Sequence, residues 1–302
     1  MRYPSKIILT EVGPRDGLQN EKTLVSTEQK LQYIDRLVTA GVQQIEVTSF
    51  VSPKWVPQMG DAAELYAKIR KKPGVRYIVL VPNEKGLENA LKVGADALAV
   101  FTAASETFNQ KNINATIKQS LQNIDLIVKK SKENKSWIRA YISTCFYCPY
   151  EGKIDPSKVS DLSLELLNMG ANEISIGDTI GKATPKQVEE LLSLLLVKLP
   201  ADKIALHFHD TRGTALANVL QGLQMGINCF DASAGGLGGC PYAVGASGNL
   251  ATEDLLFMLK GMGIESGVDL DQVAFASQGI SKALNRTLPS KYLQAYTASR
   301  CS

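Results

Sequence analysis

The feature that most constrains the fold is a regular alternation of short apolar, β-branched runs with longer stretches of helical periodicity. Eight strand-like runs occur, at residues 6–11, 43–49, 75–82, 95–101, 137–143, 172–178, 203–209 and 227–233. Strands that alternate with helices pair in parallel through βαβ crossovers, and eight is the number that closes a barrel. The sequence therefore predicts an α/β fold, a (β/α)8 TIM barrel. An open doubly wound sheet is disfavoured because "EVGPRDG" after the first run lacks the GxGxxG phosphate-binding pattern.

Local signals mark the boundaries of several helices. Residues 26–29 and 184–187 have the pattern of capping boxes, and the second adds a proline at the first helical position. Glycines at 41, 94, 170 and 226 stand where helices are expected to end. These signals support helices between the strands.

The length predicts one catalytic domain over residues 1–302, because a TIM barrel takes about 250 residues and leaves roughly 50. We place the barrel at about 5–235. An active-site loop, a capped helix ("TEDLLFMLKGMG") and a C-terminal helical extension fill about 235–302. A linker rich in proline and serine is not found.

Composition narrows the class of protein. The apolar fraction of 44% and charged fraction of 21% are typical of a soluble globular chain, and no apolar run is long enough for a membrane span. The 33 basic residues nearly balance the 30 acidic ones, so neither a nucleic-acid partner nor a membrane partner is expected. A cytoplasmic location is expected because no signal peptide is recognised.

The five cysteines are odd in number and unevenly spaced, which argues against a disulfide framework. Cys145 and Cys148 have CxxC spacing, but no second pair completes a structural zinc site. Cys301 is either an ordinary cysteine of a free tail or an exposed thiol able to cross-link subunits.

The chain has only two histidines, His207 and His209, and both lie at the end of the seventh predicted strand. Side chains at i and i+2 of a strand share a face, so Phe208 should turn toward the helices. Active sites of TIM barrels lie at the carboxyl ends of the strands. We therefore predict two imidazoles in one metal coordination sphere, although a hydrogen-bonded pair of core histidines is the alternative. Ligands without a thiolate favour Mg or Mn, with Co or Zn as further options.

Other ionisable residues lie at neighbouring strand ends. Strand one ends in Glu11 and continues into Arg15 and Asp16, strand two carries Glu46, and strand six ends in Asp178. Asp16 is either a carboxylate ligand or a turn residue of "PRDG". Arg15 could stabilise a developing oxyanion or form a surface salt bridge. Glu46 could orient Arg15 or a ligand, or could pair with a lysine for structural reasons.

A glycine-rich stretch at 232–254 surrounds Cys240 and ends shortly after Asn249. Glycines on both sides of the thiol suggest a loop that closes over a bound substrate and excludes water. The alternative is a long connection with an inert cysteine.

Six segments together resemble one known family. They are "TEVGPRDGLQNE", "VTSFVSPKWVPQMGD", "CPYEGKI", "GDTIG", "HFHDTRGTALAN" and "GGLGGCPYAVGASGNLATED". The chain is similar to the 3-hydroxy-3-methylglutaryl-CoA lyases, a family of metal-dependent aldolase-type barrels, from Thr10 to about residue 260.

The resemblance implies a retro-Claisen cleavage of 3-hydroxy-3-methylglutaryl-CoA to acetyl-CoA and acetoacetate, in leucine breakdown or ketone-body formation. It implies a divalent cation, Mg or Mn, held by Asp16, His207, His209 and Asn249. Arg15 matches the arginine that stabilises the enolate, and Cys240 matches the thiol that delivers a proton. Glu46 and Asp178 match acidic active-site positions, and His207 or Asp16 is expected to take the hydroxyl proton. We also assign Arg15, Gln19, Ser49 and Thr179 to substrate binding.

The family further implies a small-molecule acyl-CoA partner and a homodimer. We also expect a bacterial-type cytoplasmic enzyme. Two alternatives use much the same residues: a barrel synthase that condenses acetyl-CoA with a 2-oxo acid, and a lyase for a close acyl-CoA analogue. The loop with Cys240 favours the lyase over the synthase. A silent metal-binding barrel is disfavoured because every site position is intact.

Overall fold

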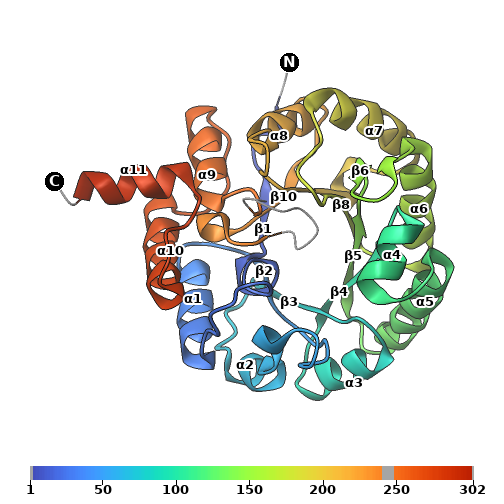
Figure 1. Cartoon of the computed structure of the whole chain (residues 1–302), viewed down its shortest axis with the longest axis horizontal. Coiled ribbons are helices and arrows are strands. Elements are labelled where there is room, and N and C mark those ends of the chain that lie inside the picture. Colours follow the sequence, from blue (N-terminus) through green and yellow to red (C-terminus); the bar gives the residue numbers. More distant parts are fainter. Residues whose placement is uncertain (1–2, 240–247, 301–302) are drawn as a thin grey trace.

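Eight parallel strands form a closed barrel in the computed structural model, which describes residues 3–239 and 248–300 (Figure 1). Their order around the barrel is β1-β10-β9-β8-β5-β4-β3-β2, and β1 pairs with both β10 and β2 to close it. The strands are β1 Ile8–Glu11, β2 Gln44–Ser49, β3 Arg76–Leu80, β4 Ala97–Ala103, β5 Trp137–Ser143, β8 Glu173–Asp178, β9 Ile204–Phe208 and β10 Cys229–Ala232. The predicted TIM barrel is confirmed, with one strand in each expected run.

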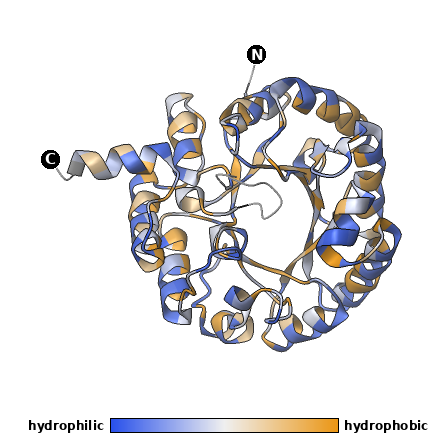
Figure 2. Cartoon of the chain, viewed as in Figure 1, coloured by the Kyte–Doolittle hydropathy of each residue, from blue (hydrophilic) through white to orange (hydrophobic). Residues whose placement is uncertain are grey.

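A ring of helices surrounds the barrel, and each carries both hydrophobic and hydrophilic residues (Figure 2). These helices are α1 Thr27–Thr39, α2 Ala62–Lys68, α3 Glu84–Lys92, α4 Glu106–Ile113, α5 Ile117–Glu133, α6 Pro156–Met169, α7 Pro185–Lys198 and α8 Ala215–Gln224. Both predicted capping boxes are present, at Ser26 before α1 and at Thr184 before α7. The glycines expected at four helix ends all have positive φ, between 75° and 119°.

Alternation along the strands divides the interior into two parts. On β9, Ile204, Leu206 and Phe208 join the large core between sheet and helices, whereas His207 points into the barrel. Phe208 lies 6.3 Å from Phe146, centroid to centroid, which confirms that it faces away from the histidines. On the opposite side of the barrel, a smaller apolar cluster lines the interior, formed by Ile78, Leu80, Ala97, Ala99 and Tyr141.

Three helices form the C-terminal extension: α9 Thr252–Gly261, α10 Leu270–Leu284 and α11 Lys291–Arg300. α10 packs beside α1, and α11 packs against α9 (Figure 1). The prediction of a capped helix at 252 was wrong, because the N-cap residue is Ala251 and no side chain caps it. Thr252 instead donates a hydrogen bond to Glu11 at 2.7 Å.

Two further features bear on the sequence predictions. A short hairpin, β6 Tyr147–Cys148 with β7 Gly152–Lys153, follows β5 and was not predicted. Cys145, Cys148 and Cys229 are buried free thiols, whereas Cys301 lies outside the described residues. Within 3–239 and 248–300, no helix has the length and apolar character needed to cross a bilayer.

Candidate active site

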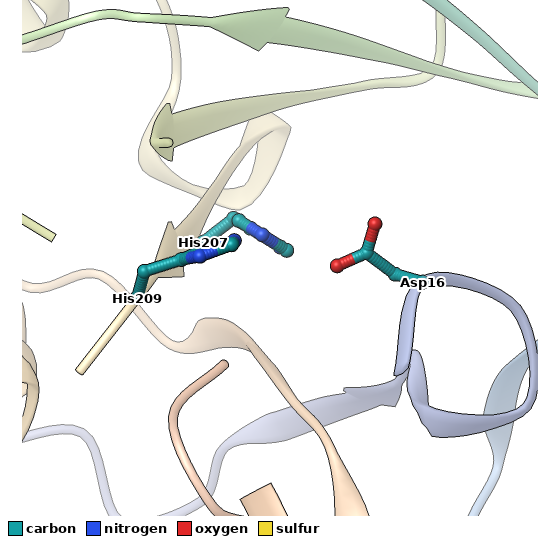
Figure 3. Close-up of side chains that lie close together, drawn as sticks. All are labelled: Asp16, His207 and His209. Carbon is teal, nitrogen blue, oxygen red and sulfur yellow. The ribbon is translucent and has the colours of Figure 1, made fainter. Parts of the chain in front are cut away.

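Asp16, His207 and His209 converge at the carboxyl ends of the strands (Figure 3). One ligand atom from each lies within 4.8 Å of the others, and the two imidazole centroids are 5.2 Å apart. His207 belongs to β9 and His209 follows its end, while Asp16 lies in the loop after β1. The three predicted ligands are therefore brought together by chain segments almost 200 residues apart, which is the arrangement expected for a metal site.

The loop that presents Asp16 is a single π-helical turn, η1 Gly13–Gly17, rather than the simple turn considered for "PRDG". Its glycines allow very close packing. A Cβ at Gly13 would lie 2.5 Å from the Tyr33 hydroxyl, and one at Gly17 would lie 2.9 Å from Leu237 Cβ. Such turns recur at functional sites, and this one turns Arg15 and Asp16 toward the barrel mouth.

Asn249 completes the cluster through a β-bridge with His209. Its Nδ2 donates to Asp16 Oδ2 at 2.8 Å and to the Leu237 carbonyl at 3.1 Å, so both amide hydrogens are used. Asn249 Oδ1 and His209 Nδ1 are buried, with no hydrogen-bond partner among the described residues. A buried acceptor without a partner costs about 1–3 kcal/mol.

These unpartnered atoms are the test of whether the cluster fits a cation. Imidazole nitrogens and a carboxylate oxygen converge without a thiolate, the amide of Asn249 contacts that carboxylate, and two buried polar atoms have no hydrogen-bond partner among the described residues. A divalent metal ion that takes nitrogen and oxygen ligands would satisfy them. The residues present therefore fit a divalent cation.

Arg15 is 6% exposed and is fixed by two carboxylates, which excludes the surface salt bridge considered from the sequence. Its guanidinium lies 2.6 Å from Glu46 and 2.7 Å from Asp16, so Glu46 contacts Arg15 as predicted. Tyr141 donates to Glu46 at 3.1 Å and places its ring 5.6 Å from the Arg15 guanidinium carbon. Burial lowers the pKa of Arg15, but Glu46 and Asp16 outweigh it and hold that pKa above its usual value.

The pKa values of the three ionisable residues of the cluster are shifted in different directions. Burial raises the pKa of Asp16, but the charges of Arg15 and the histidines outweigh it and lower that pKa to about 2. Burial, with the neighbouring His207, lowers the pKa of His209 to about 4. Burial also lowers the pKa of His207, but its hydrogen bond and charge interaction with Asp231 raise it above the usual value. The cluster therefore combines an ionised carboxylate with one imidazole that stays neutral near pH 7.

The remaining predicted residues differ in their contacts. Gln19 donates to Asp16 at 2.9 Å, and Thr179 accepts from the Thr144 amide at 2.8 Å. Ser49 Oγ is buried and has no hydrogen-bond partner among the described residues. Asp178 accepts from the amides of Lys182 and Ala183, and burial raises its pKa to about 6. Cys240 lies outside the described residues.

Three buried polar residues in or beside the site were missed from the sequence: Tyr141, Arg139 and Asp231. Tyr141 and Arg139 lie on β5, and Asp231 Oδ2 on β10 lies 3.1 Å from His207 Nδ1. The signal that could have found the two charged residues is a charge in the middle of an otherwise apolar strand, in "WIRAYIS" and "INCFDAS". Glu11, in contrast, points away from the cluster and contacts Ala234 and Thr252.

The fold and the site define a TIM barrel with a candidate metal centre at its mouth, and comparisons with known proteins give its relatives. A family model described as HMGL-like matches residues 6–280. Hydroxymethylglutaryl-CoA lyase YngG of Bacillus subtilis is 50% identical over 99% of this chain and 100% of its own. The crystal structure of hydroxymethylglutaryl-CoA lyase from Pseudomonas aeruginosa is 47% identical over 99% of this chain and 100% of its own, with a TM-score of 0.97.

An HMG-CoA lyase from Acinetobacter baumannii, solved in complex with coenzyme A and 3-methylmalate, is 39% identical. It covers 98% of this chain and 96% of its own, with a TM-score of 0.93. The chain belongs to the HMGL-like family, and within it to the hydroxymethylglutaryl-CoA lyases. The family predicted from the six sequence segments is confirmed.

Proposed function

We propose that this chain cleaves 3-hydroxy-3-methylglutaryl-CoA to acetyl-CoA and acetoacetate, with a divalent cation held by Asp16, His207, His209 and Asn249. The observation that carries the proposal is the pair of buried, unpartnered atoms, Asn249 Oδ1 and His209 Nδ1, beside Asp16 and His207. The relative solved with coenzyme A supports an acyl-CoA as the substrate class.

The cation, Mg or Mn, would act as a Lewis acid on the substrate hydroxyl and orient a neighbouring oxygen. The chain itself must remove the hydroxyl proton, and His207 and Asp16 are the candidates. Asp16 accepts from Arg15, Gln19 and Asn249, which lowers its basicity, but a carboxylate that binds a cation keeps lone pairs for a proton, whereas an imidazole bound through its one free nitrogen does not. Loss of that proton forms the ketone of acetoacetate as the carbon–carbon bond breaks.

The electron pair of the broken bond passes to the thioester and forms the enolate of acetyl-CoA. Arg15 stabilises this oxyanion, because its charge is fixed by Glu46 and its Nε is a buried donor without a partner among the described residues. A proton delivered to the enolate carbon then completes acetyl-CoA, and we assign its delivery to Cys240. Asp178 is proposed as an acidic residue of the site, and Gln19, Ser49 and Thr179 as substrate-binding residues.

A direct product assay tests the proposal. The purified protein is treated with a chelator, supplied with Mg²⁺ or Mn²⁺, and incubated with 3-hydroxy-3-methylglutaryl-CoA while acetoacetate is measured. We expect acetoacetate only with metal, and none from the His209→Ala variant, whose folding is checked by its circular dichroism. Absence of product with either metal, together with free CoA released from acetyl-CoA and a 2-oxo acid, would assign a condensing synthase instead. Cleavage of only a close acyl-CoA analogue would change the acyl group.

We further propose a homodimer in the cytoplasm, acting in leucine breakdown or ketone-body formation. The assembly is tested by light scattering on the eluting protein, where the proposal requires a mass of twice 32.7 kDa. A mass of one chain at assay concentration would reject the dimer without affecting the lyase assignment.

A further inference from the structure

We infer that Asp231 is the positioning residue of His207, and that it acts by fixing which imidazole nitrogen is free to bind an ion. This inference rests on the proposed role of His207 as a metal ligand. Asp231 and His207 are register neighbours on β10 and β9, and both side chains point into the barrel. Asp231 Oδ2 lies 3.1 Å from His207 Nδ1.

The carboxylate of Asp231 is itself held from several strands. Its Oδ1 pairs with Arg139 Nη2, and its Oδ2 accepts from Ser175 at 3.0 Å. Arg139 is fully buried on β5 and reaches across the interior of the barrel. There its Nη1 donates to Thr10 on β1 at 2.7 Å and lies 3.1 Å from Glu173 on β8. The position of Asp231 is thus set, directly or through Arg139, by residues of three other strands, β1, β5 and β8.

The charge of Arg139 determines the direction of the bond to His207. An ionised carboxylate beside a guanidinium can only accept, so His207 Nδ1 must carry the hydrogen. A neutral imidazole has one N–H, which leaves Nε2 with its lone pair for a cation. A carboxylate on the far nitrogen is the arrangement that orients metal-bound histidines in proteins.

The second histidine of the cluster lacks such a partner. His209 Nδ1 is buried and accepts or donates no hydrogen bond among the described residues. The two imidazoles therefore differ: the first is oriented before any ion arrives, and the second has its Nδ1 unpartnered. If the inference is correct, loss of Asp231 reduces the affinity for metal through His207 alone.

Mn²⁺ binding to the metal-free protein provides the test, measured by electron paramagnetic resonance of the free ion. We expect Asp231→Asn to weaken Mn²⁺ binding about 10- to 100-fold, as is typical when such a partner is lost. Cys229→Ser is the matched control. Cys229 lies two residues earlier on the same strand and donates to Glu173 at 3.1 Å, so it belongs to the same buried network without touching His207. Its Mn²⁺ affinity should equal that of the wild type.

A second measurement on the wild type does not depend on whether the variant folds. The chain has two histidines, so imidazole nitrogen resonances of the metal-free protein are assigned with one variant, His209→Gln. We expect His207 with its hydrogen on Nδ1, and a smaller population of that tautomer in Asp231→Asn. A hydrogen on Nε2 in the wild type, or equal Mn²⁺ affinities of wild type and Asp231→Asn, would overturn the inference. Failure of the wild type to bind Mn²⁺ at all would instead reject the proposed metal site.

Discussion

The interior of the barrel has two sides that are equally shielded from water and differently filled. On β3 and β4, the inward residues are Ile78, Leu80, Ala97 and Ala99. On β1, β5, β8, β9 and β10, the inward residues include Thr10, Arg139, Ser175, His207 and Asp231. Apolar packing fills the first side, and hydrogen bonds and ion pairs fill the second.

The two sides differ in how strictly the orientation of each side chain is fixed. Apolar side chains tolerate exchange for others of similar volume, because dispersion and burial are not directional. A buried hydrogen-bonded network allows one geometry, since each broken contact leaves a polar group unpaired. The proposed metal ligand on β9, His207, lies on the hydrogen-bonded side, where the bond to Asp231 fixes the orientation of its imidazole in addition to its packing.

The largest effect is expected from Arg15→Gln, which removes the buried cation of the polar side nearest the mouth. Removal of one donor that stabilises a developing oxyanion costs about 10²–10³-fold in kcat. We expect a loss of that size in acetoacetate production, with a smaller change in KM, because the enolate forms only during the reaction.

Arg15→Lys is the control, because it keeps a cation beside Glu46 but lacks the planar guanidinium with its paired N–H donors. It should retain more activity than the glutamine variant. Full turnover by both variants would remove Arg15 from the mechanism.

On the apolar side, Ile78→Ala should act on stability instead of chemistry. Ile78 is fully buried inside the barrel, and truncation of such a residue costs about 2–5 kcal/mol of the free energy of unfolding. Urea unfolding of the metal-free protein measures this loss, and Ile78→Val, with an expected cost of about 0.5–1.5 kcal/mol, gives a graded control.

The Mn²⁺ affinity of folded Ile78→Ala should stay within about threefold of the wild type if the apolar side contributes packing alone. A tenfold loss of affinity without a loss of stability would mean that the two sides are coupled, and the comparison would fail.

The fold could be predicted from the sequence because the outward faces of the barrel strands are largely apolar. On β5, Ile138, Ala140 and Ile142 face the helices and form the recognisable pattern. The hairpin of β6 and β7 was not readable, since strands of two residues carry no periodicity. The helix that begins at Thr252 was expected to be capped, but the Thr252 hydroxyl bonds to Glu11, a contact 241 residues distant in sequence.

Only part of the site could be predicted from the sequence, because several of its contacts join distant segments of the chain. His207 and His209 are recognisable because their spacing places them on one face of a single strand. The roles of Asn249 and Cys240 were assigned from the family resemblance, although the glycines around Cys240 had already suggested an active-site loop. Arg139 and Asp231 were missed because they are 92 residues apart, and only the closed order of the barrel brings β5 and β10 into contact range across its interior.

A third region, outside the barrel wall, holds buried carboxylates without a neighbouring cation in the described part of the chain. Glu11 accepts from the amides of Gly13 and Ala234, and Glu253 accepts from that of Gly235. Burial raises the pKa of Glu11 from 4.5 to about 8 and that of Glu253 from 4.5 to about 7. Neither carboxylate has an ion-pair partner among the described residues, in contrast to Asp231.

We predict that these two residues make the metal-free protein less stable as the pH rises. Above about pH 4.5 the unfolded chain releases the proton of each carboxyl, whereas the folded chain keeps it up to about pH 7 or 8. The folded state then binds more protons, so the free energy of unfolding falls with rising pH, by about 1.4 kcal/mol per pH unit for each carboxyl in this range. Urea unfolding at several pH values measures the slope.

Glu11→Gln and Glu253→Gln should each flatten that slope, since an amide does not titrate in this range. A variant that kept the wild-type pH dependence would show that its carboxyl is ionised in the folded state throughout. Asp231→Asn should not flatten the slope, because ion pairing with Arg139 outweighs burial and lowers the pKa of Asp231.

The smallest effect is expected at the outer edge of the molecule, where Asp254 joins α9 to α11. Its Oδ1 accepts from Ser290 Oγ and the Tyr292 amide, both at 2.8 Å, and its Oδ2 accepts from the Lys291 amide at 3.1 Å. The carboxylate therefore caps α11. Asp254→Asn keeps one acceptor oxygen, so it should cost about 1 kcal/mol in urea unfolding, and Asp254→Ala about 2 kcal/mol.

Both variants should retain wild-type Mn²⁺ affinity, because this cap lies outside both sides of the barrel interior. If Asp254→Asn lost Mn²⁺ affinity in proportion to its loss of stability, the placement of α11 would affect the proposed metal ligands. The route would be the contact of Ser290 with the Gly235 carbonyl, which leads toward Leu237 and Asn249. The hydrogen-bonded network of the polar side would then include the C-terminal helices and would not end at the strands.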